Sequence, residues 1–187
     1  MKAIILILML VMSTFAHQEN LEVGPKDIAQ FIQGFLKGAL GEDFGDIEAC
    51  MGNADSLIHD IESIIKSIGS GKIDWMDLVI HIGALIKDVP DAIKNCKSLP
   101  SKITDTFKAW VSKIKNPFNI IKIIANATLH YLSRLTGDVK NFLSHWKGQR
   151  YRDSGEALGD IPFVLFTKCE MESRIPDEAV FEVLISE

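Results

Sequence analysis

The sequence predicts an all-α protein, a single-domain bundle of about five to seven helices. Apolar residues recur at intervals of three and four along most of the chain, which is the spacing of one helix face. Glycine, proline and helix-capping residues separate these periodic stretches. The chain of 187 residues is long enough for one buried core and short for two domains. With 47% hydrophobic and 24% charged residues, its composition is that of an ordinary globular protein.

The first residues predict a signal peptide. Lys2 gives a positive start, residues 3–12 form an unbroken apolar run, and small residues suited to a signal peptidase end at Ala16. The run is about half the ~20 residues that a membrane-spanning helix needs, although an uncleaved helix is the alternative. We therefore expect residues 1–16 to be removed. The mature protein would be secreted or extracellular, or would stay in the lumen of a secretory compartment.

Two helices are predicted before residue 69. Pro25 begins the first, which has an apolar stripe and a break after residue 40. Gly34 and Gly38 lie four residues apart on it, a spacing that predicts close approach of a neighbouring helix. The second follows a seam from Ile47 to Ile68 and ends at the glycine-rich turn 69–71.

A third helix should pair with the second as an antiparallel hairpin. Asp74 predicts its N-cap, and its seam runs from Val79 to Cys96. Pro90 lies within this pattern and should kink or divide the helix.

Three further helices complete the predicted bundle. One follows Pro100 and ends before Asn116. The next is long, has a seam from Phe118 through Leu132 to Trp146, and has Gly137 as a candidate interruption. The last covers 153–161 or beyond, with Pro162 distorting it. The chain is thus divided into a signal peptide (1–16), a helical bundle (17–168) and a weakly patterned tail (169–187).

The three cysteines predict one disulfide. Cys50 and Cys96 fall on the seams of the two hairpin helices, and the residue counts on either side of the turn place them at a similar level. Export to an oxidising compartment favours a Cys50–Cys96 bridge over two buried thiols. Cys169 is then the odd cysteine. It is either a reduced thiol, a bridge to a second molecule, or a replacement for one member of the pair.

Charge is unevenly distributed along the chain. Residues 100–150 carry 9 Lys/Arg and 2 Asp/Glu, whereas 17–99 carry 7 and 14 and 151–187 carry 3 and 9. The simplest expectation is pairing between helices, with the remaining lysines facing water. The alternative is contact with an anionic membrane surface through an aromatic and basic set, namely Lys108, Trp110, Lys113, Lys115 and Phe118. Nucleic acid is not expected as a partner, because the protein is acidic and exported.

The sequence predicts no catalytic, cofactor or metal site. His59 and His81 lie on facing helices without the further ligands that a metal ion needs, and residues 69–72 lack most of a phosphate-binding loop. The carboxylates lie on helix faces with no feature that marks a raised pKa. Asn126 begins a glycosylation sequon, although its place inside a predicted helix argues against use of the site.

Four short motifs follow one another in a recognisable order. They are FIQGF at 31–35, GDIEAC at 45–50, VPDAIKNC at 89–96 and GEALGDI at 155–161. This order resembles a group of small, secreted, helical proteins of ciliated protozoa, to about Phe166. The resemblance implies export and a helical fold, and no activity, since none is assigned to the group.

The leading hypothesis is a secreted, non-enzymatic binding or structural protein. It would act by protein–protein contact on helix faces, with an unknown protein partner and an oligomeric state that the sequence leaves open. The first alternative is a protein that binds lipid or a membrane surface, and the second is a hydrolase of unrecognised type.

Overall fold

The computed structural model describes residues 23–68, 72–97 and 99–169. In these ranges the chain forms six α-helices and a π-helical turn, with no strand. The predicted fold class is therefore confirmed, and the number of helices falls within the predicted range. The predicted signal peptide, the turn at 69–71 and the tail from residue 170 lie outside the described residues.

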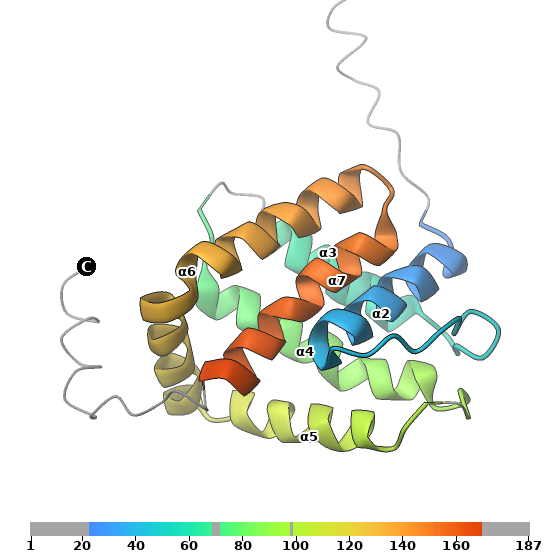
Figure 1. The fold of residues 1–187 in the computed structure, drawn as a ribbon, viewed down its shortest axis with the longest axis horizontal. Coiled ribbons are helices and arrows are strands. Elements are labelled where there is room, and N and C mark those ends of the chain that lie inside the picture. Colours follow the sequence, from blue (N-terminus) through green and yellow to red (C-terminus); the bar gives the residue numbers. More distant parts are fainter. Residues whose placement is uncertain (1–22, 69–71, 98, 170–187) are drawn as a thin grey trace, which may run out of the picture.

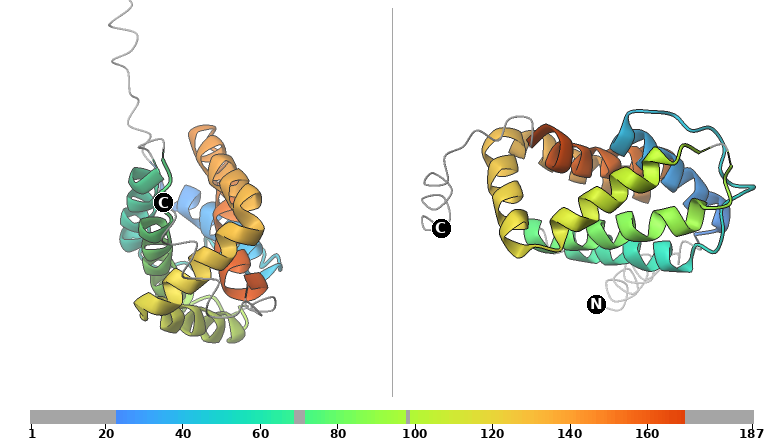
Figure 2. Two further views of the ribbon diagram at one scale, coloured as in Figure 1. Left: turned by 90° about the vertical axis from the view of Figure 1, so that its left-hand side faces the viewer. Right: turned by 90° about the horizontal axis from the view of Figure 1, so that it is seen from below.

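The helices form two sides of a bundle (Figure 1). In Figure 2 (left), α3 and α4 lie on one side and α6 and α7 on the other. Helix α2 packs along α7, and α5 packs against α4. The elements are α2 (Pro25–Leu40), α3 (Asp55–Ile68), α4 (Trp75–Ile93), α5 (Lys102–Ile114), α6 (Pro117–Lys147), α7 (Tyr151–Phe163) and the π-helical turn η1 (Val164–Lys168).

Glycines bring α2 and α7 into backbone contact. A β-carbon at Gly34 would lie 1.8 Å from a backbone carbonyl oxygen of α7, and one at Gly155 would lie 1.9 Å from the carbonyl oxygen of Phe31. Gly38 and Gly159 repeat this arrangement one helical turn further along. The close approach predicted from the α2 glycines is confirmed, and α7 contributes a matching pair with the same spacing.

The predicted helix starts are confirmed at α2 and α4. Pro25 is the first residue of α2, and the Asp27 carboxylate accepts a hydrogen bond of 3.0 Å from the Gly24 N–H. The Asp74 side chain accepts one of 3.0 Å from the Asp77 N–H at the start of α4. Each aspartate satisfies a backbone donor that has no partner within the helix.

Pro90 does not divide α4, and Gly137 does not interrupt α6. Each residue lies inside a continuous helix, so the expected division at Pro90 and the expected interruption at Gly137 are wrong. Buried side chains on either side hold α4 in place, which outweighs the local cost of the proline. Pro162 also lies inside its helix, and the π-helical turn η1 follows directly after it.

The expected start of the second hairpin helix is wrong. Helix α3 begins at Asp55, and residues 47–54 form a connection that carries Cys50. The Asn53 side chain accepts a hydrogen bond of 2.8 Å from the Asp55 N–H, which fixes the start of the helix. The Gly52 N–H donates to the carbonyl oxygen of Ala92 at 2.7 Å, so this connection is attached to the end of α4. Ile47 belongs to this connection, and its side chain is buried in the core. A buried side chain at this position fits the apolar spacing of a helix, although the residue is not helical.

The seam predicted along α6 is correct in its second half and correct only in part in its first half, where Ala125 is buried as expected. Leu135, Val139 and Phe142 are buried as expected, whereas Phe118 and Leu132 are exposed. In Figure 1 the two halves of α6 run in different directions, and the orange half lies along α7. Periodicity predicts which face of a helix is apolar, but not how much of that face has a partner.

Candidate functional site

An open groove of about 750 Å³ lies between α4 and α5. The two helices are neighbours along the lower edge of the molecule in Figure 1. The groove follows both helices and ends at the loop that joins them. Its lining consists of Ile86, Lys87, Pro90, Asp91, Ile93, Lys94, Cys96, Leu99, Pro100, Ser101, Ile103, Thr104, Phe107, Lys108, Val111, Ser112 and Lys115.

The floor of the groove is apolar. Ile86 and Ile93 supply it from α4, and Ile103 and Phe107 supply it from α5. All four side chains are buried and belong to the hydrophobic core. The floor is therefore one edge of the core and is held rigidly by the packing beneath it.

The rim of the groove is basic. Lys87 and Lys94 stand on the α4 side, and Lys108 and Lys115 stand on the α5 side. All four lysines are exposed, and among the described residues of the lining only Asp91 is acidic, although Lys87 also pairs with Asp88 at 3.6 Å. Each pair is seven residues apart, a spacing that returns to one face of a helix after about two turns. The spacing places each pair on one face of its own helix, but the sequence gives no sign that the two pairs face each other across a groove.

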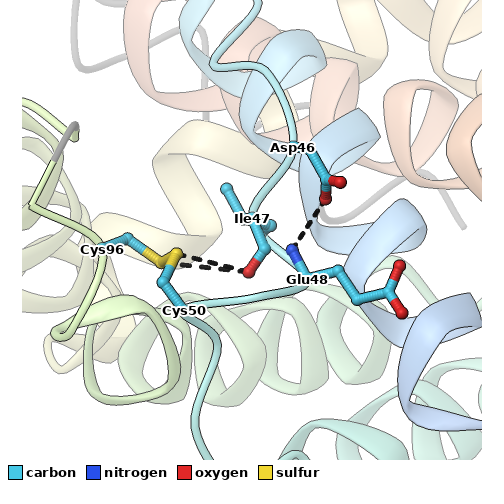
Figure 3. Close-up of a disulfide and its surroundings, with 5 residues drawn as sticks. All are labelled: Asp46, Ile47, Glu48, Cys50 and Cys96. Atoms are coloured by element: carbon cyan, nitrogen blue, oxygen red, sulfur yellow. Dashed lines mark hydrogen bonds between the residues drawn. A yellow bond between two sulfur atoms is a disulfide. The ribbon is translucent and has the colours of Figure 1, made fainter.

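A disulfide closes one end of the groove. The predicted Cys50–Cys96 bridge is confirmed, with Cα atoms 5.0 Å apart. It joins the α2–α3 connection to the residues that follow α4, and Figure 3 shows both sulfurs facing the carbonyl oxygen of Ile47. The Sγ atom of Cys50 lies 3.3 Å from this oxygen, and the Sγ atom of Cys96 lies 4.0 Å from it. These are van der Waals contacts and not hydrogen bonds, because the sulfurs of a disulfide carry no hydrogen. The Asp46 side chain accepts a hydrogen bond of 2.8 Å from the Glu48 N–H, which shapes the same turn.

The structure separates the residues that the membrane-surface alternative groups together. Trp110 is only 4% exposed and packs between Phe107 and Phe166, with ring centroids 5.5 Å from each. Lys108 and Lys115 line the groove, Lys113 is partly buried, and Phe118 is exposed at the start of α6. A buried tryptophan cannot serve as the interfacial anchor of that alternative.

Asn126 and Cys169 lie together inside the fold. The Asn126 side-chain nitrogen donates to the Cys169 carbonyl oxygen at 2.9 Å, and both residues are buried. A glycan would be attached to this same nitrogen, so the placement favours an unmodified amide. Cys169 stands outside the disulfide, and its side chain faces the core.

Among the described residues, Arg134 and Lys102 join the basic middle of the chain to its acidic flanks by ion pairs, as expected from the charge distribution. Arg134 on α6 donates two hydrogen bonds of 2.7 Å to the carboxylate of Asp160 on α7. Lys102 of α5 pairs with Glu42, which follows α2. Because both ion pairs are exposed to solvent, they add little to the free energy of unfolding. Their main effect is to hold the paired segments in one position relative to each other.

Two aspartates have raised pKa values, which the sequence gives no sign of. Burial, followed by the charge of Asp160 and a hydrogen bond to it, raises the pKa of Asp138 to about 7. Burial, followed by the charge of Asp88, raises the pKa of Asp60 between α3 and α4. In both cases the second carboxylate comes from another helix, so only the folded chain brings the two together.

Replacing Asp138 with asparagine should flatten the pH dependence of stability. Because the folded pKa lies above the unfolded value of 3.8, the folded state holds the proton more tightly, and stability falls as pH rises from about 4 to about 7. After a reduction for partial exposure to solvent, we expect Asp138→Asn to gain about 1–2 kcal/mol over the original protein between pH 5 and pH 8. Urea unfolding at the two pH values measures this difference. The exposed Asp105→Asn variant is the control, and parallel profiles for Asp138→Asn and the original protein would contradict the assignment.

The described parts of the chain hold no cluster of three or more His, Cys, Asp or Glu side chains placed to bind a metal ion. His59 lies on α3 and His81 on α4, where the His81 Nε2 atom is 3.4 Å from the Asp77 carboxylate. Within the same described ranges, no helix combines the length and the apolar character needed to cross a membrane.

Comparison with known proteins gives one match. The family model SctB-like, described as Secreted protein B-like, matches residues 12–167. No curated protein and no solved structure gives a significant match. The matched residues include the disulfide, the groove and the paired glycines of α2 and α7.

Proposed function

Because this chain belongs to the SctB-like family, described as Secreted protein B-like, we propose that it acts after export as a non-enzymatic binding protein. Its partner would be another protein, and the α4–α5 groove would be the contact surface. The disulfide supports export, since such bonds persist in oxidising compartments. The expectation that the chain is not an enzyme remains part of this proposal.

The observation that carries the proposal is the chemistry of the groove. An apolar floor between two rows of lysines matches an amphipathic helix whose apolar side chains face inward and whose acidic side chains meet the rim. Lysines seven residues apart span about 10 Å, so each wall faces about two turns of such a helix. The acidic residues would guide the encounter and set its specificity, and the partly exposed side chains of Leu99 and Val111 would meet the apolar face of the partner.

The shape of the site supports a protein partner over a membrane. A bilayer presents a broad surface, whereas this site is a concave groove with its apolar residues at the bottom. Trp110, the residue best suited to a membrane interface, is part of the core.

Binding of a designed peptide tests the proposal. The probe is a fluorescent helical peptide of about 14 residues, roughly 21 Å long, with leucine on one face and glutamate elsewhere. Fluorescence anisotropy should show saturable binding that weakens as salt is raised. Lys94→Glu with Lys108→Glu, one change on each wall, should weaken binding by about tenfold or more.

A matched variant and two further probes complete the experiment. Lys140→Glu with Lys147→Glu makes the same charge change on exposed positions of α6, and it should alter binding by less than about twofold. A lysine version of the peptide should bind weakly or not at all. Equal effects of the two double variants would contradict the proposal, as would binding to anionic vesicles without binding to the acidic peptide.

A further inference from the structure

Helices α6 and α7 pack along each other (Figure 1), and a pair of carboxyl groups lies between them. Asp138 on α6 and Asp160 on α7 are joined by a side-chain hydrogen bond. Within the described residues, the buried Oδ2 atom of Asp138 has no donor in reach. Two ionised carboxylates can only accept hydrogen bonds, so a bond between them requires a shared proton. The arrangement is therefore that of a carboxylic acid donating to a carboxylate.

Arg134 can pair with either member of this carboxyl pair. Its guanidinium donates two hydrogen bonds of 2.7 Å to the Asp160 carboxylate, and these bonds connect α6 to α7. Asp138 follows Arg134 by four residues on α6, a spacing at which oppositely charged side chains meet on one helix face. Tyr131, one turn earlier on the same helix, is a further titratable group near the guanidinium. An ionised Asp138 would therefore compete with Asp160 for Arg134.

The other charged groups around the pair lie in an open pocket of about 480 Å³ between α2, α6 and α7. The carboxyl pair lines this pocket, so water can reach it. Lys37 of α2 pairs with Glu156 of α7 at 2.8 Å. Among the described residues, Asp153 of α7 and His145 of α6 are the other titratable groups in the lining. Since Lys37 is held by Glu156, Arg134 is the cation that responds to a change of charge on the pair.

We infer that Asp138, Asp160 and Arg134 form a pH-dependent latch between α6 and α7. In acid, Asp138 is neutral and donates to Asp160, which also accepts from Arg134, so both α6 side chains hold α7. As the pH rises past neutral, the Asp138 proton passes to water and the two carboxylates repel each other. Arg134 then turns toward the carboxylate on its own helix, and the second half of α6 loosens from α7. The latch contains no residue of the α4–α5 groove and does not depend on the proposed function.

Hydrogen–deuterium exchange of the full mature chain tests the latch. Rates at about pH 5.5 and about pH 8 are expressed relative to residues 57–66 of α3, which cancels the intrinsic effect of pH and any loss of global stability. On this scale, residues 134–142 and 156–163 should exchange about fivefold faster or more at the higher pH. Asp138→Asn should abolish the rise, because its amide donates to Asp160 at either pH. Asp153→Asn, at an exposed position in the same pocket, should retain it. A rise of equal size in α3, or no rise, would overturn the inference.

Carbon-13 NMR of the aspartate side chains gives an independent measurement without any substitution. As the pH rises, the carboxyl carbons of Asp138 and Asp160 should change chemical shift together, because the two groups share one proton. Over the same pH range, the Nε–H of Arg134 should lose its protection from exchange relative to that of the exposed Arg150. Separate titration of the two carboxyl carbons, or an Arg134 that stays protected at high pH, would refute the latch.

Discussion

Replacing Gly155 with alanine is expected to destabilise the fold by about 4 kcal/mol or more, which is enough to unfold many small domains. The added β-carbon would lie 1.9 Å from the Phe31 carbonyl oxygen, and the atoms in the way belong to the backbone of α2. No side chain can rotate to relieve this clash, so α2 and α7 must separate. Separation would uncover the core residues Phe31 and Phe35.

Circular dichroism with urea unfolding measures this effect. Gly137→Ala is the matched control, because a β-carbon there meets no atom within 4 Å inside a continuous helix. That change should be neutral or stabilise the protein by up to about 1 kcal/mol. A Gly155→Ala protein as stable as the control would show that α2 and α7 do not make this backbone contact.

Loss of the disulfide should cost about 2–4 kcal/mol of stability. The bridge joins residues separated by 46 positions, and so it restricts the unfolded chain over the whole α3–α4 hairpin. Replacing both Cys50 and Cys96 with serine removes the bridge without leaving an unpaired thiol. Urea unfolding of this variant should match that of the original protein under reducing conditions. If reductant does not change the stability of the original protein, the bridge is not part of the folded state in solution.

Local signals in the sequence predicted much of this fold. Pro25 and Asp74 mark helix starts because their effect depends only on neighbouring residues. The Gly34 and Gly38 spacing predicted a close helix contact, but not that α7 would be the partner. The disulfide was predicted even though Cys50 lies outside the helix assigned to it, because the turn still brings the two segments together.

Features that depend on long-range packing were not predictable in the same way. The apolar periodicity of α6 runs from Phe118 through Leu132, but both of these side chains are exposed in the folded chain. The raised pKa of Asp138 needs Asp160, which comes from another helix. The groove needs lysines from α4 and α5 on facing walls, and each pair alone looks like an ordinary solvated face.

The most direct test of the proposed protein–protein function is zero-length crosslinking of the mature protein in its own secretory fluid. A carbodiimide joins lysine amines to carboxylates that are already in contact. We expect crosslinks from Lys94 and Lys108 to aspartate or glutamate residues of another protein, and their loss when both lysines are replaced with glutamate. Crosslinks to other proteins that arise only from lysines outside the groove, or an absence of crosslinks to any other protein, would contradict the proposed function.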